Sequence, residues 1–103
     1  NAADILVDMK GERLYASYRS VQEIDAFEID RRTGKLSPLG YAPTRGMVRG
    51  LHWGRSGVLY ALGEELPQVD GGVEVFSVEE NGAAPLQSRA YIASPQAFNF
   101  VVY

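Results

Sequence analysis

The sequence has 103 residues, of which 46% are hydrophobic and 22% are charged, which is ordinary for a globular domain and unlike a disordered chain. Its formal net charge of -3 gives no electrostatic footprint for nucleic acid or an anionic membrane surface. The sequence contains no cysteine, which excludes disulfides, cysteine nucleophiles and thiolate metal sites. Its one histidine, His52, excludes a multi-histidine metal site supplied by this chain alone. No apolar run approaches the roughly 20 residues of a membrane span, and residues 1–4 lack the features of a signal peptide.

Short runs in which apolar and polar residues alternate predict β-strands along most of the chain, with turn-forming residues between them. A proline in the fourth run suits an outer strand, because proline cannot donate to a β-ladder. No segment has a convincing helical period. The expected strands cover residues 5–7, 13–18, 24–29, 36–41, 49–53, 58–62, 73–78, 86–90 and 97–102.

The order of strands and turns occurs twice. Leu14 and Leu59 are 45 residues apart, whereas Phe27 and Phe76 are 49 apart because the second copy has a longer loop. A period near 45 residues with four strands per repeat is typical of a β-propeller blade, and a plain antiparallel sandwich is the alternative. We therefore predict an all-β chain with propeller blades over residues 1–46 and 47–94 and one extra inner strand over residues 95–103.

Two series of segments, one in each repeat, resemble a known family. The first series is Ala2-Ala3-Asp4-Ile5, residues 11–19, residues 24–29 and Thr33-Gly34-Lys35-Leu36. In the second, residues 48–51 are similar to a Pro-Arg-Gly/His-aromatic strand opening, and residues 57–64 to a Gly-x-x-Leu-Tyr-x-x-Asn-Glu strand. Together they resemble the lactonase family of seven-bladed propellers, which includes the bacterial propeller-type 6-phosphogluconolactonase and the fungal 3-carboxy-cis,cis-muconate cyclase.

This resemblance implies a cytoplasmic lactonase-type hydrolase of carbohydrate metabolism, acting on an anionic sugar-acid lactone such as 6-phosphogluconolactone. We expect no cofactor and assign no metal ligand among these residues, and the metal dependence of the complete protein stays open. The chain aligns best with the C-terminal end of family members. There, the strand matching residues 95–103 is the innermost strand of a blade that strands from the N-terminus complete. The sequence departs from the family pattern at Val48, where proline is preferred, and at Tyr18 and Gly63, where Asn or Asp is common.

Propeller geometry places a set of polar residues on one rim of the disc. The innermost strand of a blade crosses from one face to the other and the next strand returns, so the start of the first and the end of the second share a face. The strand starts are Asp4, Arg49 and Gln96, and the strand ends are Arg19 and Glu64. Polar residues at equivalent positions of a repeated scaffold indicate a site at the channel mouth.

These rim residues suit the hydrolysis of an anionic lactone. Arginine binds phosphate or carboxylate with forked, charge-assisted hydrogen bonds, and hydrolysis needs an activated water and a stabilised oxyanion. We assign Glu64 as the base and Arg19 or Arg49 as the oxyanion stabiliser, roles that the resemblance also implies. Asp4 and Gln96 are assigned to substrate binding. The alternative is that Arg19, Arg49 and Glu64 form inter-blade salt bridges.

His52 lies three residues into an expected inner strand, which favours a packed or channel-lining histidine, and we add it to the substrate-binding candidates. No serine lies in a Gly-x-Ser-x-Gly elbow, so the sequence gives no support to a serine nucleophile. Asp70-Gly71-Gly72 and Asn81-Gly82 predict turns. Aromatic residues at equivalent or packing positions are expected in the core: Tyr15, Phe27, Trp53, Tyr60 and Phe76.

Three functions therefore stay open: a lactonase, a muconate-type lactonizing cyclase and a non-catalytic propeller that serves as a binding scaffold. Two blades and a lone strand leave apolar faces and strand edges uncovered. We expect the missing blades to come from the rest of a longer protein, from a second chain or from self-association. We expect lactonase activity from the complete ring and none from this chain alone, with no nucleic-acid or membrane partner.

Overall fold

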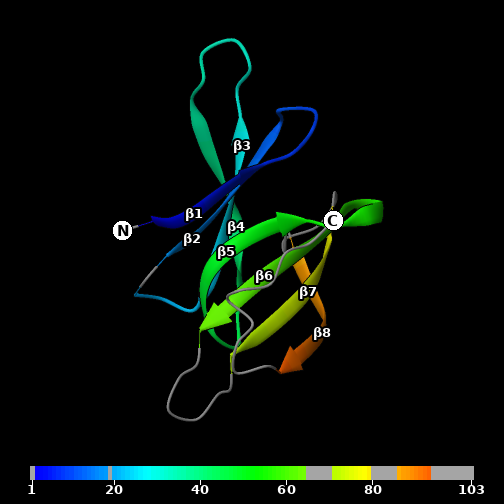
Figure 1. Cartoon of the computed structure of the whole chain (residues 1–103). Coiled ribbons are helices and arrows are strands. Elements are labelled where there is room, and N and C mark those ends of the chain that lie inside the picture. Colours follow the sequence, from blue (N-terminus) through cyan, green and yellow to red (C-terminus); the bar gives the residue numbers. More distant parts are fainter. Residues whose placement is uncertain (1, 19, 65–70, 80–85, 94–103) are drawn as a thin grey trace.

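The computed structural model describes residues 2–18, 20–64, 71–79 and 86–93, which form two four-stranded sheets (Figure 1). Neighbouring strands in each sheet are antiparallel and follow chain order from the innermost to the outermost strand. The first sheet contains β1 (Ala2–Val7), β2 (Arg13–Tyr18), β3 (Glu23–Ile29) and β4 (Leu36–Pro43). The second contains β5 (Met47–Trp53), β6 (Val58–Glu64), β7 (Gly72–Val78) and β8 (Leu86–Ala93).

These strands confirm the all-β fold predicted from the alternating pattern and its repeat. Eight of the nine expected strands are present, and several extend one to three residues further than predicted. The ninth, expected within residues 95–103, lies outside the described residues. Between β5 and β6 the chain makes a single 3-10 turn, Arg55–Gly57.

Tight turns join β1 to β2 and β3 to β4. In the first, the Asp8 carboxylate accepts hydrogen bonds from the backbone N–H groups of Glu12 and Arg13, at 2.8 and 3.2 Å. In the second, Gly34 adopts a φ of 78°, a left-handed conformation that glycine reaches without a Cβ clash. The backbone N–H of Gly34 donates to the carbonyl of Asp30, which closes the predicted hairpin turn.

The apolar core lies between the two sheets. Tyr15, Ile24 and Ala26 of the first sheet pack against a set from the second that includes Leu59 and Phe76, and all five are at most 1% exposed. Because side chains alternate between the faces of a strand, the residues next to Ile24 and Ala26 on β3 point away from the second sheet. The first sheet is therefore covered on one face and open on the other.

The innermost strands β1 and β5 lie side by side, and Trp53 fastens them together. Its ring meets Tyr15 edge-on, with centroids 5.7 Å apart, and its indole N–H donates to the carbonyl of Val7 at 3.0 Å. Of the aromatic residues expected in the core, Tyr15 and Phe76 are fully buried. Phe27, Trp53 and Tyr60 are only partly buried.

Candidate functional site

Antiparallel pairing brings the start of each innermost strand beside the end of the next strand. Met47 at the start of β5 pairs with Glu64 at the end of β6, and Ala2 of β1 pairs with Tyr18 of β2. The candidate rim therefore lies where β5 begins and β6 ends. Two of the predicted rim residues, Arg19 and Gln96, lie outside the described residues.

The structure brings Arg49 and Glu64 together on this rim. Arg49 Nε lies 2.8 Å from Glu64 Oε1, with the two side chains 55% and 42% exposed. Arg49 is the extra residue of a β-bulge in β5, where the register shifts between Val48 and Gly50. Bulges redirect side chains and recur beside active sites. The bulge in β5 therefore turns the Arg49 side chain away from the direction that regular strand pairing would give it. The pair offers a cation and a carboxylate to solvent at a single point.

Glycines allow the backbone between β4 and β5 to pass close to the end of β6, which carries Glu64. A Cβ on Gly46 would lie 3.2 Å from the carbonyl oxygen of Glu64 and 3.5 Å from the Cα of Gly63. The connection between β4 and β5 therefore runs directly against the end of β6. As a result, the backbone that carries Glu64 is supported by residues from the other sheet's connection.

Asp4 has a structural role that the sequence did not indicate. Its Oδ2 accepts a hydrogen bond from the backbone N–H of Leu51 at 2.8 Å, and its Oδ1 accepts one from Ile5 at 2.9 Å. The carboxylate thus links β1 to β5 across the blade junction. The expected equivalence of Asp4 and Arg49 was also wrong by one residue, because the bulges in β1 and β5 make Gly50 the counterpart of Asp4.

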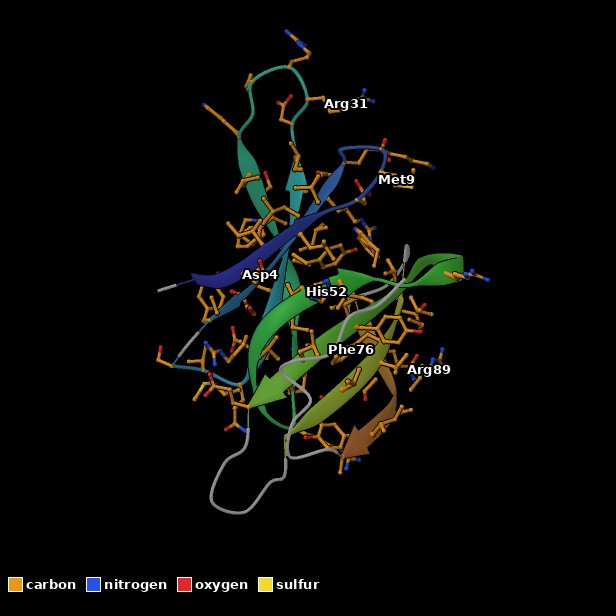
Figure 2. All side chains as sticks on the ribbon, in the orientation of Figure 1. Asp4, Met9, Arg31, His52, Phe76 and Arg89 are labelled. Carbon is orange, nitrogen blue, oxygen red and sulfur yellow. The ribbon has the colours of Figure 1, made fainter. Side chains whose placement is uncertain are left out.

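His52 is exposed on the innermost strand β5, where it pairs with Tyr60 of β6. Its imidazole leans back along the strand, since a Cβ on Gly50 would lie 3.5 Å from His52 Nε2. Figure 2 shows His52 and Asp4 on the two neighbouring innermost strands. An innermost strand borders the propeller channel, so this position fits a channel-lining histidine.

Sequence reasoning missed a buried carboxylate, Glu74 of β7. Glu74 is only 4% exposed. Its carboxylate accepts a hydrogen bond from the Arg45 backbone N–H at 3.0 Å and one from the Ser88 hydroxyl at 2.6 Å. The Arg45 guanidinium lies over the Tyr91 ring, 5.3 Å from its centroid. An available signal was the single charge within the apolar run of β7, which demands a partner if it is buried.

A second acidic group lies on the open face of the first sheet, at β2 and β3. A hydrogen bond with Asp25, together with partial desolvation and repulsion from that carboxylate, raises the pKa of Glu23. Burial, followed by the charge of Asp25, raises the pKa of Tyr18. Two carboxylates this close disfavour double ionisation, so the pair favours a nearby cation.

Some kinds of site are not found in the part of the chain that the structure describes. Residues 2–18, 20–64, 71–79 and 86–93 contain no group of three or more His, Asp or Glu side chains that could hold a metal ion. The same residues form no helix with the length and apolar character needed to cross a membrane.

The pattern of residues 1–102 matches the family described as lactonase, seven-bladed β-propeller. No curated protein matches the chain. Among solved structures, the chain is similar to a protein of Bacteroides uniformis described as an inferred 6-phosphogluconolactonase, with 26% identity and a TM-score of 0.72. A protein of Bacteroides fragilis with the same description superposes equally well, at 19% identity and a TM-score of 0.72, which bears on the fold alone.

Both likenesses cover 90% of this chain and 26% of the other. The chain thus spans about a quarter of the length of these two proteins. The family match extends through both described sheets, whose strand order and antiparallel pairing are those of propeller blades. The chain belongs to the lactonase family of seven-bladed β-propellers.

Proposed function

We propose that this chain contributes part of the active site of a hydrolase that opens an anionic sugar-acid lactone, such as 6-phosphogluconolactone, when the remaining blades complete the ring. The observation that carries the proposal is the exposed Arg49–Glu64 pair at the rim, 2.8 Å apart. Support also comes from the family match and from the description of the Bacteroides uniformis protein.

The two side chains have complementary roles in such a reaction. Glu64 accepts a proton from a water molecule as the water oxygen bonds to the lactone carbonyl carbon. Arg49 donates hydrogen bonds to the oxyanion that develops on the carbonyl oxygen. The tetrahedral intermediate then collapses, the ring C–O bond breaks, and the leaving oxygen takes the proton that Glu64 holds, which gives the open hydroxy acid and restores the Glu64 carboxylate.

The test uses an intact propeller that carries this chain, with hydrolysis of 6-phosphogluconolactone measured above its spontaneous rate. Loss of a general base lowers kcat by roughly 10²- to 10⁴-fold, so we expect a decrease in this range for Glu64→Gln. We expect Arg49→Ala to raise KM and lower kcat while the protein stays folded. Glu28→Gln, which removes an exposed carboxylate from β3, is the matched control.

The competing explanation is that Arg49 and Glu64 form an ion pair with no part in catalysis. In that case, both variants would turn over the lactone at the rate of the control. Equal losses of folding stability and activity in Arg49→Ala would also favour this explanation. A propeller that folds with all its rim residues present and shows no lactonase activity would refute the proposed function.

A further inference from the structure

The second blade holds the connection that enters it from the first blade. This connection, residues 44–46, is named the linker here. Its Arg45 backbone N–H donates to the buried Glu74 carboxylate, and its Arg45 guanidinium covers Tyr91. The side-chain amide of Gln22 fixes the other side of the linker by donating to the carbonyl of Arg45 at 2.9 Å. An acid on the third strand and a tyrosine on the fourth therefore form a socket for an arginine-bearing linker.

The pairing register shows that the first blade has the same two residues at equivalent positions. Asp25 of β3 pairs with Tyr41 of β4, as Glu74 of β7 pairs with Tyr91 of β8. The register between the third and fourth strands then shifts immediately after the following residue in both blades. The acid and the tyrosine are therefore repeated features of the blade.

In the first blade this socket is open. Together with Glu23, Phe27 and Pro38, Asp25 and Tyr41 line a hollow in the sheet surface, and Tyr41 is 59% exposed. Asp25 Oδ1 is buried and has no hydrogen-bond partner among the described residues. Leaving a buried acceptor without a hydrogen bond costs free energy, so a donor that reaches Asp25 Oδ1 would stabilise the blade.

A difference between the two blades explains why Asp25 Oδ1 lacks the kind of donor that Glu74 has on its fourth strand. In the second blade the Ser88 hydroxyl donates to Glu74 at 2.6 Å. The register places Pro38 at the position of Ser88, since each lies opposite the phenylalanine of the third strand. Proline has no side-chain donor and no backbone N–H. Within the blade, Tyr18 and Glu23 form hydrogen bonds with Asp25, but Oδ1 is left without a partner. The donor to Oδ1 therefore comes from outside the blade.

We propose that the hollow at Asp25 and Tyr41 binds the arginine-bearing linker of another propeller blade. The linker would donate a backbone N–H to Asp25 and lay its guanidinium over Tyr41, as Arg45 does in the second blade. Asp25, Glu23 and Phe27 lie on the face of β3 opposite Ile24 and Ala26, which contact the second blade. The partner is thus a blade that precedes this one in the ring.

The sequence argues that this partner is not a second copy of the present chain. Arg45 is the second residue after β4, which ends at Pro43, and the second residue after Ala93 of β8 is Pro95. Pro95 itself lies outside the described residues, but proline supplies neither a backbone N–H nor a cation. The socket therefore fits a blade with a different linker sequence.

Binding of the peptide N-acetyl-Thr-Arg-Gly-amide, which copies residues 44–46, tests this proposal. The peptide would be titrated into the isotopically labelled chain and followed through amide NMR shifts. We expect saturable shifts at Asp25 and Tyr41, while those at Glu74 and Tyr91, whose socket is already filled, stay unchanged. Asp25→Asn should weaken binding roughly tenfold, because a hydrogen bond to a charged acceptor is lost. Tyr41→Leu should weaken it about threefold by removing the cation–π contact.

Two controls separate this socket from general charge attraction. The peptide with citrulline in place of arginine keeps the shape but loses the cation, and it should bind several-fold more weakly. Glu28→Gln removes one negative charge from the same strand outside the hollow, and it should leave the affinity unchanged. Unperturbed shifts in the second blade would verify that each variant is folded. Absence of saturable binding, equal binding by Asp25→Asn, or equal binding of the citrulline peptide would overturn the proposal.

Discussion

Replacement of Glu74 by alanine should destabilise the chain more than the loss of any other single carboxylate described here. The Arg45 N–H would lose its acceptor at 3.0 Å in a partly buried place. The Ser88 hydroxyl would also lose its acceptor, but Ser88 is exposed and can bond to water instead. The unpaired Arg45 N–H and the cavity left by the Glu74 side chain together lower the free energy of unfolding by about 2–4 kcal/mol. Glu74→Gln keeps an acceptor for Arg45 and should lose only about 1 kcal/mol.

Urea unfolding followed by fluorescence measures this directly, because Trp53 is the sole tryptophan and lies at the junction of the two sheets. The exposed Glu28→Gln variant is the matched control, with an expected change within about 0.5 kcal/mol. The reasoning fails if Glu74→Ala unfolds at the same urea concentration as this control. It also fails if Glu74→Gln is as unstable as Glu74→Ala, because the acceptor would then not be the decisive group.

Three further predictions concern the blade junction, a close contact and the acidic face. Trp53→Phe removes the hydrogen bond to Val7 and should lower the unfolding free energy by about 1 kcal/mol in chemical denaturation followed by circular dichroism. Gly54→Ala should cost about 1–3 kcal/mol in the same assay, because its Cβ would overlap Cε2 of the Tyr60 ring and lie 2.8 Å from Val58 Cγ2. An unchanged stability would show that the ring moves aside freely. The raised pKa of Glu23 means that the folded chain holds this proton more tightly than the unfolded chain, so its contribution to stability is present at acid pH and is lost as pH rises through the raised pKa, above 4.5. Glu23→Gln should therefore make the melting temperature less dependent on pH in this window, and an unchanged slope would count against the coupling to Asp25.

The fold could be predicted from the sequence because its signals are local and repeated. Residues 13–18 were predicted as a strand with the bounds that the structure has. Other ends were placed too early, as for β8, which continues to Ala93 because that residue pairs with Gly72 of β7. Such extensions depend on the neighbouring strand and not on the alternation of the segment itself.

The candidate site was predicted only where it depends on adjacent strands. Arg49 and Glu64 meet because β5 and β6 pair directly, so the repeat was enough to bring them together. The bulge at Arg49 inserts one residue, which a count along the chain does not reveal. Glu74 was missed because its partner Arg45 comes from the connection between the sheets, and only the packing of one blade on the other brings them together.

The division of roles between the buried Glu74 and the exposed Arg49–Glu64 pair bears on how the rim can act. Arg49 meets Glu64 through Nε, so a substrate that takes the Nε–H must open this bond, whereas the two terminal NH2 groups can bind an anion with the bond in place. Both side chains are about half exposed, so solvent screens the pair, and opening it costs only about 0.2–1 kcal/mol. By comparison, removing one partner of a buried ion pair costs about 3–5 kcal/mol. Because Glu74 and the core secure the blade junction, the proposed exchange of the Arg49–Glu64 bond for a bond to substrate would not loosen the fold.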